Sequence, residues 1–421
     1  MGRNIRKQDP KVGRGISADY PLFVVMFLIL ALGLFMVLDA SYARASQPTP
    51  MTHGNAYYFL ERQALWAFVG ILALVWAMNM RYWKLSRYGP FAMILAFVLL
   101  LLVWAPGVGV HSHGAARWIN LRIIQIQPSE IAKVCCVLFL AGYLPARKLK
   151  VQKLEGLLVG VFLPVGLIAA LIIKQPDLGT ALSLLATCFI MLFVGGAQVK
   201  HLLAIAAVGA LLLSIYCLAR PYTAKRLLGF VDGGAGSTTY AYQVDQSVEA
   251  LQAGGLHGLG PGQGDAKFFH LPAPYTDFIA ATLGEEFGLV GSLTLLGLFF
   301  FFTLRGCHIA HRCPNPYGTL LATGLCSMVT VQALLNLAVV TRSLPNTGVP
   351  LPMVSFGGSS LMLVLFATGL LLSVSRWPDL KDIDAALEST GRGSSSTSAA
   401  AGGRRPTLLK IDTDVHEMAR H

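Results

Sequence analysis

Two acidic positions near residue 280 have the residue types and spacing for acid–base chemistry. In the stretch HLPAPYTDFIAATLGEEFG, Asp277 stands immediately before an apolar run, and Glu285 and Glu286 lie within it. An aspartate at a boundary between water and lipid loses solvation, which favours proton uptake, so Asp277 is predicted to act as a general base. The alternative for Asp277 is a simple N-cap of the helix that follows.

The two glutamates of this stretch are also unusual. Glu286 lies nine residues after Asp277, which is about 13 Å farther along a helix. Carboxylates are costly in apolar surroundings, so Glu285 and Glu286 cannot both face lipid. We expect at least one of them to turn inward, where it pairs with a basic residue or lines a wet cavity.

A second polar cluster, RWINLRIIQIQPSEIAK, joins a loop to the start of another apolar run. Arg117 belongs to the loop, and Pro128, Ser129 and Glu130 together form a sensible helix start. Glu130 and Lys133 are three residues apart and can pair across one helical turn. The pair is interpreted either as part of a substrate site or as a purely structural helix start.

Two further clusters interrupt the apolar pattern. KQPDLGT contains Lys174, Gln175 and Asp177 in a very short turn, where Asp177 can cap the next helix. In RSLPNTGVPLPMVSFGGSS the backbone is broken at Pro345, Gly348, Pro350, Pro352, Gly357 and Gly358. Non-helical backbone at membrane depth requires protein or water to satisfy it, so this stretch predicts a cavity on the same side as Asp277.

No motif identifies a metal site. His308, His311 and Cys313 have a spacing that could bind a metal, but three loosely spaced ligands on a short loop are weak grounds. No cluster of outer carboxylates shows clear ligand spacing. We therefore predict no metal ligands and leave open a divalent cation, Mg or Mn, as a cofactor.

The composition indicates which elements must hold these residues. The chain has 421 residues, of which 54% are hydrophobic and 13% charged, and its mean hydropathy is +0.60. A soluble domain carries about 25% charged residues. The composition excludes a soluble enzyme, a disordered protein and a nucleic-acid-binding protein. The net charge of +12 identifies no partner, because membrane proteins concentrate basic residues in cytoplasmic loops.

Ten apolar runs are long enough for helices that cross about 30 Å of hydrocarbon. They lie near residues 20–40, 63–80, 89–106, 128–144, 155–173, 178–195, 200–218, 279–304, 317–341 and 352–375. The runs are continuous rather than alternating, so they are helices and not barrel strands. The predicted fold is an all-α polytopic membrane protein with ten transmembrane helices.

The basic residues predict the orientation. With the N-terminus inside, 22 of the 33 Lys and Arg residues fall on the cytoplasmic side and 10 fall outside. Both termini are therefore cytoplasmic, which requires an even number of spans. The predicted domains are a basic cytoplasmic tail (1–19), the ten-helix domain (20–376) and a cytoplasmic tail (377–421). The second tail contains GRGSSSTSAAAGGRRP and is predicted to be disordered and dispensable for chemistry.

Residues 219–278 form a long extracytoplasmic loop between the seventh and eighth helices. Its length of about 60 residues far exceeds an ordinary connection, and such loops are usually functional or disordered. Its aromatic, basic and glycine-rich pieces indicate partial order. The piece GLHGLGPGQG follows no strand, so flexible turns are favoured over a nucleotide-binding loop.

Five ordered motifs carry a resemblance to a known family. They are GAARWIN, IQPSEIAK, KQPDLGTA, FFHLPAPYTDFIAATLGEEFG and LPNTGVPLPMVSFGGSSL. From about residue 20 to 376 the chain resembles the SEDS family of bacterial shape, elongation, division and sporulation proteins. The segment YFLERQALWA (58–67) is more similar to the division members than to the elongation members. The positions that depart from the usual family residues are Pro274, Tyr275, Ala280, Met353 and Phe356.

The resemblance implies an inverting peptidoglycan glycosyltransferase that polymerises lipid II outside the bacterial cytoplasmic membrane, at the division septum, and releases undecaprenyl pyrophosphate. Asp277 matches the family's essential aspartate and would deprotonate the 4-hydroxyl of the acceptor GlcNAc. Substrate or pyrophosphate contacts are predicted for Arg117, Lys133, Lys174, Arg226, Glu286 and Ser359, and less so for Lys225 and Arg342. Supporting roles are predicted for Glu130, Gln175, Asp177, Thr276, Pro352, Gly357 and Gly358.

The implied partners are a class B penicillin-binding transpeptidase, other divisome membrane proteins, and glycan linked to undecaprenyl pyrophosphate. The alternatives are a glycosyltransferase of the elongation type, a scaffold, and a lipid II flippase in which Asp277 and Glu286 relay protons or bind the head group. An alternating-access site should lie near the midplane. The polar clusters instead gather at the outer face, which favours the enzyme. A scaffold would need neither the outer aspartate nor the broken-helix cavity.

Overall fold

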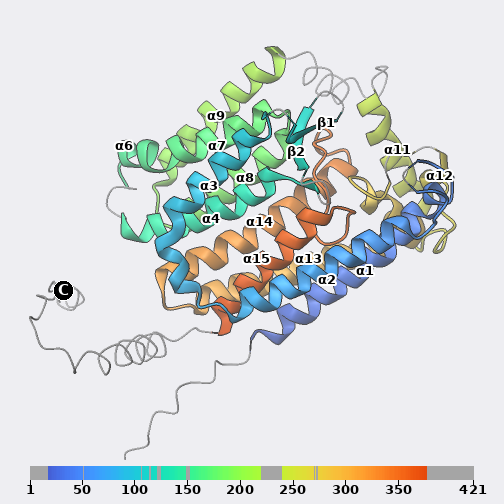
Figure 1. The fold of residues 1–421 in the computed structure, drawn as a ribbon, viewed down its shortest axis with the longest axis horizontal. Coiled ribbons are helices and arrows are strands. Elements are labelled where there is room, and N and C mark those ends of the chain that lie inside the picture. Colours follow the sequence, from blue (N-terminus) through green and yellow to red (C-terminus); the bar gives the residue numbers. More distant parts are fainter. Residues whose placement is uncertain are drawn as a thin grey trace, which may run out of the picture. The chain divides into compact units, whose positions relative to one another are not determined.

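The computed structural model describes residues 18–376, apart from 51, 106, 113–114, 121–124, 148–151, 220–238, 270 and 272–273. These residues belong to one compact unit, Gly15–Pro378, which consists mainly of helices (Figure 1). The chain before residue 18 and after residue 376 lies outside the described residues, so the two predicted tails stay predictions.

The apolar runs form helices, as predicted. The long elements are α1 (Tyr20–Ala45), α2 (Tyr58–Asn79), η1 and α3 (Tyr82–Tyr88, Gly89–Leu102), α4 (Pro128–Ala146), α6, η2 and α7 (Leu154–Leu157, Leu158–Phe162, Leu163–Lys174), α8 (Leu178–Val194), α9 (Val199–Ala219), α13 (Ile279–Arg312), α14 (Pro316–Val340) and α15 (Gly358–Arg376). Two further helices, α11 (Thr239–Gly254) and α12 (Ala266–Phe269), lie within the long segment 219–278.

Nine helices in the described part of the chain are long and apolar enough to cross a membrane. The remaining apolar run forms α8, which has 17 residues. The fold class is therefore confirmed, while the number of ten spans stays a prediction. The largest differences from the predicted boundaries are that α13 continues past residue 304 to Arg312 and that α15 begins only at Gly358. Smaller ones are that α1 continues past residue 40 to Ala45 and that α2 begins at Tyr58 and not at residue 63.

Local signals set several helix starts. The side chain of Asp19 accepts a hydrogen bond from Leu22 N, 2.9 Å away, and caps α1. Pro128 occupies the first position of α4, where a missing N–H costs nothing. Asn315 caps α14 by accepting from Tyr317 N at 3.0 Å. These caps fix where each apolar helix begins.

The most buried helices lie in the centre of the unit. In the most apolar windows of α4, α14 and α15, 61%, 61% and 72% of the residues are buried, against 6% in α9. Helix α14 packs against α13, α8, α4 and α15, and α1 packs against α13 and α2. The central helix α14 is therefore able to connect the polar clusters carried by its neighbours.

A small sheet precedes α4 and was not predicted. Its strands, β1 (Gly109–Ser112), β2 (Ala115–Asn120) and β3 (Gln125–Ile126), are antiparallel in the order β1-β2-β3. Ile119 pairs with Ile126. Arg117 lies on β2, and β2 contacts α4.

Helix α13 is interrupted at Gly288, whose φ of 64° and ψ of −159° are not helical. Residues of the glycine-rich stretch after α11 bond to both sides of the break. Leu259 N and Gly260 N donate to the carbonyls of Glu285 and Glu286, at 3.0 and 2.9 Å. On the other side, the amide of residue 289 donates to Gly255 O at 2.9 Å. The stretch forms turns, as predicted, and these turns are also backbone partners of α13.

Replacement of Gly288 with alanine is expected to destabilise the fold by about 2–4 kcal/mol, since a strained φ and an overpacked position each cost about 1–3 kcal/mol. A Cβ at this position would lie 2.4 Å from Gly258 N and 2.6 Å from Leu256 O. Thermal unfolding in detergent would measure the loss. Gly297→Ala is the matched control, because that glycine of α13 has nothing within 4 Å of a Cβ. Equal melting temperatures for the two variants would contradict the role of Gly288.

Candidate active site

Asp277 is half-buried and lies two residues before α13. Phe278, and not Asp277, is the N-cap residue of α13, so the N-cap alternative is wrong. The backbone carbonyl of Asp277 accepts a hydrogen bond from Asn336 Nδ2 at 2.7 Å. A Cβ built on Gly348 would lie 3.6 Å from Asp277 Oδ2, so the backbone of the broken stretch approaches the carboxylate closely.

The broken stretch between α14 and α15 is bonded to the residues just before Asp277. Ser355 Oγ donates to Thr276 O at 2.6 Å, and Phe356 N donates to Tyr275 O at 2.8 Å. Gln63 of α2 accepts from Gly357 N at 3.2 Å and donates to the carbonyl of Ser355 at 3.0 Å. This irregular backbone is therefore satisfied by protein groups, as its position among apolar helices requires.

Two glycines allow the close approaches in this stretch. Gly348 has a φ of 67°, a conformation that glycine adopts without the cost of a side chain. At Gly358 a Cβ would lie 2.1 Å from the indole nitrogen of Trp66, so only glycine fits against that ring. Pro352 is buried between them. The glycines thus fix the path of the backbone past Asp277.

An aromatic cluster lies beside the aspartate. The rings of Phe59 and Tyr275 are 4.5 Å apart, and Phe356 lies 5.2 and 5.9 Å from them. Burial raises the pKa of the Tyr275 hydroxyl, and the charge of Arg44 opposes this effect. The Tyr275 hydroxyl therefore stays neutral. Two of the positions that depart from the family pattern, Tyr275 and Phe356, are therefore in direct contact.

Lys133 and Glu130 form the ion pair predicted from their spacing. Lys133 Nζ lies 2.8 Å from Glu130 Oε1 and donates to Gln332 Oε1 at 2.6 Å. Ser360 Oγ donates to Glu130 Oε2 at 3.1 Å. Both charged side chains are at least 96% buried, so the pair lies inside the helix bundle. Gln332 also donates to Pro350 O at 3.0 Å, which links Lys133 to the broken stretch.

Asp177 caps α8, as predicted, by accepting from Thr180 N at 3.2 Å. The same carboxylate accepts from Gln127 Nε2 at 3.0 Å and from Ser129 Oγ at 3.4 Å, both at the start of α4. The backbone N–H of Gln127 donates to Ser359 Oγ at 3.4 Å. The starts of α4, α8 and α15 are therefore joined by one hydrogen-bonded network.

Arg117 reaches the turn before α8. Its Nε donates to Gln175 O at 3.0 Å, and a second guanidinium nitrogen donates to Pro176 O. The side chain of Gln175 is buried and donates to Leu100 O at 3.1 Å. Lys174 is exposed, with its ammonium 5.3 Å from the centre of the Trp104 ring. The turn 174–177 therefore contains one cation, Lys174, and is contacted by a second, Arg117.

Gln332 and Asn336 of α14 are the functional candidates that the sequence analysis missed. They lie four residues apart and thus on one face of the helix. Gln332 joins Lys133 to Pro350 O, and Asn336 joins Asp277 O to Val349 O, at 2.7 and 2.8 Å. Both are 1% exposed. Two amides at helical spacing in an otherwise apolar run are the signal that could have identified them.

Two of the predicted substrate residues, Glu286 and Arg342, pair with residues outside this network. Glu286 pairs with Lys267 at 2.5 Å, and both side chains are buried. Arg342 pairs with Asp245 at 3.0 Å. Lys225 and Arg226 lie outside the described residues. The network around Asp277 therefore contains Arg117, Lys133 and their neighbours.

The described residues contain no cluster of metal-ligating side chains. No group of three or more His, Cys, Asp or Glu side chains in this part of the chain could hold a metal ion. The carboxylates of Glu130 and Asp177 instead bind an ammonium, amides and hydroxyls. Within this part of the chain, no set of protein ligands identifies a divalent cation.

Comparison with a family model and with known proteins gives consistent matches. The model for FtsW, RodA and SpoVE, described as "Cell cycle protein", matches residues 20–379. Stage V sporulation protein E of Bacillus subtilis is 37% identical over 368 residues, which cover 86% of this chain and 98% of that protein. The probable peptidoglycan glycosyltransferase FtsW of Nitrosococcus halophilus is 38% identical over 381 residues, covering 89% and 96%.

Solved structures show the same fold. A chain from a study of "Structural coordination of polymerization and crosslinking by a peptidoglycan synthase complex" superposes with a TM-score of 0.72 and 29% identity, covering 87% of this chain and 99% of that one. The rod shape determining protein RodA of Thermus thermophilus superposes with a TM-score of 0.62 and 28% identity, covering 86% and 98%.

Proposed function

The chain belongs to the family of cell cycle proteins that comprises FtsW, RodA and SpoVE, and we propose that it is a peptidoglycan glycosyltransferase that polymerises lipid II. The relatives named as probable peptidoglycan glycosyltransferases support the reaction class. The observation that carries the proposal is the position of Asp277, whose carboxylate lies beside Gly348 of the broken stretch and whose carbonyl is held by Asn336.

In the proposed reaction, Asp277 accepts the proton of the 4-hydroxyl of GlcNAc on an incoming lipid II. The oxygen attacks the anomeric carbon of MurNAc at the end of the growing glycan, with inversion. A new glycosidic bond forms, the bond between that carbon and pyrophosphate breaks, and undecaprenyl pyrophosphate leaves with the bonding electrons. General base catalysis contributes typically about 10²- to 10⁴-fold.

The departing pyrophosphate develops negative charge, which preorganised cations stabilise. Our candidates are Arg117, Lys133, Lys174 and Arg226. Support for Arg117 and Lys174 comes from their common place at the turn before α8, and support for Lys133 from its link through Gln332 to the broken stretch. A divalent cation could share this charge without being held by a dedicated protein site.

We further propose that the enzyme acts at the outer face of the cytoplasmic membrane during division, together with a class B penicillin-binding transpeptidase and other divisome proteins. The relatives named FtsW support the division role, and the peptidoglycan synthase complex among the similar structures supports a synthase partner. Depletion in cells tests the role, because a division enzyme gives filaments and an elongation enzyme gives rounded cells.

Purified protein given labelled lipid II, with and without its cognate transpeptidase, is expected to produce long glycan strands on a gel. A preparation that makes no polymer even with the partner would contradict the proposal. If the same preparation moved lipid II across vesicle membranes faster than empty vesicles do, the flippase alternative would replace it.

A further inference from the structure

Three charged groups, of which Lys267 and Glu286 are buried and Asp39 is partly buried, lie together outside the network around Asp277. Lys267 of α12 pairs with Glu286 of α13 at 2.5 Å and with both carboxylate oxygens of Asp39 of α1, at 2.8 and 2.9 Å. The side chains of Lys267, Glu286 and Asp39 are 3%, 0% and 12% exposed. We call these residues the ionic lock.

The ionic lock closes a segment of chain around Asp277. Lys267 lies ten residues before Asp277 and Glu286 nine residues after it, so their ion pair joins the two ends of a segment with Asp277 near its middle. Glu285 reinforces this closure, because its Oε1 accepts from the backbone N–H groups of Asp265 and Ala266 at 2.9 and 3.1 Å. A closed segment has fewer conformations available than an open one.

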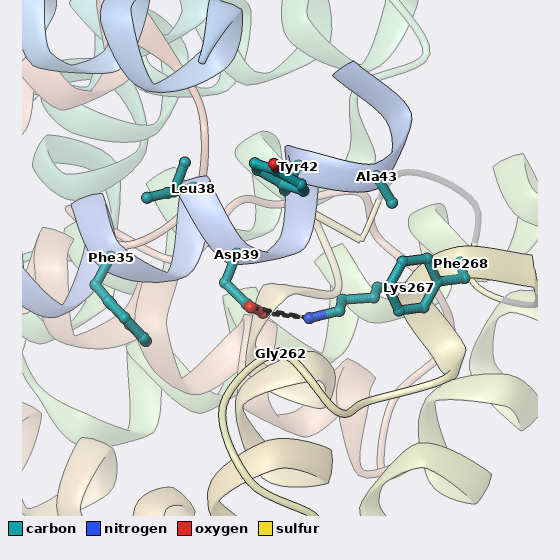
Figure 2. A pocket seen from close by; sticks show the side chains of 8 residues that line it. All are labelled: Phe35, Leu38, Asp39, Tyr42, Ala43, Gly262, Lys267 and Phe268. Carbon is teal, nitrogen blue, oxygen red and sulfur yellow. Dashed lines mark hydrogen bonds and ion pairs between the residues drawn. The ribbon is translucent and has the colours of Figure 1, made fainter. Parts of the chain in front are cut away.

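The third member of the ionic lock ties this closed segment to another helix. Figure 2 shows the carboxylate of Asp39, on α1, directed at the ammonium of Lys267 from α12. A hollow of about 190 Å³ lies beside the pair, with Phe35, Tyr42 and Phe268 among its walls. Two carboxylates therefore hold one ammonium, and each comes from a different long helix.

From this geometry we propose that Lys267 is a positioning residue for Asp277. Its ion pairs with Glu286 and with Asp39 of α1 hold the 267–286 segment against α1, and this keeps Asp277 in its catalytic position. The inference rests on the proposed function of Asp277 as the general base. The opposite side of the segment is held by the bonds from Asn336, Ser355 and Phe356, so Asp277 is fixed from both directions. A misplacement of about 1 Å can cost on the order of 100-fold in rate.

A purely structural role is the alternative, because removing one partner of a buried ion pair can by itself destabilise the fold and so lower activity. The chain offers a matched control for that alternative. Arg305 of α13 pairs with Asp19 before α1, with contacts of 3.2 and 2.5 Å. This pair also joins α1 to α13, but it lies twenty residues from Asp39 along α1, or about 30 Å.

Lys267→Met is expected to lower kcat for polymerisation by about 10- to 100-fold and to leave KM for lipid II within about twofold. This pattern is expected because Lys267 acts through Asp277, whose contribution is made in the transition state. Lys267→Arg should retain most of kcat, because a guanidinium can bind both carboxylates and the hollow offers room for it. Arg305→Met should keep the wild-type kcat. Hydrogen exchange should be faster around residues 274–279 in Lys267→Met alone.

Wild-type kcat in folded Lys267→Met, an equal loss in Arg305→Met, or unchanged exchange around residues 274–279 would each overturn the proposal. If Lys267→Met does not fold, Asp39→Asn and Glu286→Gln replace it, and wild-type kcat in both would overturn it too. If the wild type makes no polymer, the proposed function fails instead. The exchange comparison then still decides whether the ionic lock orders the segment.

Discussion

Asp277→Asn is expected to reduce the rate of glycan polymerisation by about 10²- to 10⁴-fold, the contribution of a general base, in a protein that still folds. Asparagine has nearly the shape of aspartate but cannot accept the proton of the attacking hydroxyl. The bond from Asn336 reaches the backbone carbonyl of residue 277, so the substitution leaves that support in place. The variant should therefore lose the chemical step and retain its structure.

The measurement compares purified wild type and Asp277→Asn with labelled lipid II and the transpeptidase partner. Binding of the partner and the melting temperature should match those of the wild type. Glu249→Gln is the control for the loss of one carboxylate, since Glu249 is exposed on α11 and contacts Gln246. Polymer from Asp277→Asn at more than about a tenth of the wild-type rate would remove this residue from the base role.

Lys133→Met is expected to destabilise the fold by about 3–5 kcal/mol, because it leaves a buried carboxylate unpaired, and to lower polymerisation as well. The ammonium of Lys133 lies between Glu130 and Gln332, at 2.8 and 2.6 Å. Without it, Glu130 loses this charged partner and keeps the neutral donor Ser360. Thermal unfolding and the polymerisation assay would measure the two effects separately.

The double variant Glu130→Gln with Lys133→Met separates stability from chemistry. It removes both charges, so the fold should regain most of the stability that Lys133→Met loses. Polymerisation should stay low if Lys133 stabilises the leaving pyrophosphate. Recovery of activity together with stability would show instead that Lys133 is only structural, which is the alternative that its spacing with Glu130 left open.

Features that depend on nearby residues could be predicted from the sequence. The apolar runs identified the helices, and the spacing of Glu130 and Lys133 predicted their ion pair. Asp177 was predicted to cap α8, and at least one glutamate after Asp277 was expected to turn inward; both Glu285 and Glu286 are buried. Each of these features follows from helical periodicity or from the cost of charge in lipid, which act over a few residues.

Features that depend on distant residues could not be predicted. Lys267 was not a candidate, because its partner Asp39 lies 228 residues away in the first helix. The break at Gly288 is stabilised by backbone groups near Gly255 and Leu259. Bonds between backbone groups do not depend on residue type, so the sequence pattern does not predict them. Gln332 appears as one polar residue in an apolar run until its contact with Lys133, 199 residues away, is known.

The residues that hold Asp277 are synthesised at different times. Asp39 and Lys267 precede Asp277 in the chain, whereas Asn336 and Ser355 follow it. Asn336 lies 59 residues after Asp277, and Ser355 lies 79 residues after the carbonyl that it binds. At about 5–20 residues per second, those 79 residues take roughly 4–16 s. The 267–286 segment can therefore close on α1 while its aspartate still lacks the residues that hold its other side. A nascent chain should therefore gain activity only after Ser355 has been made, so an incomplete chain that lacks it should not start glycan strands.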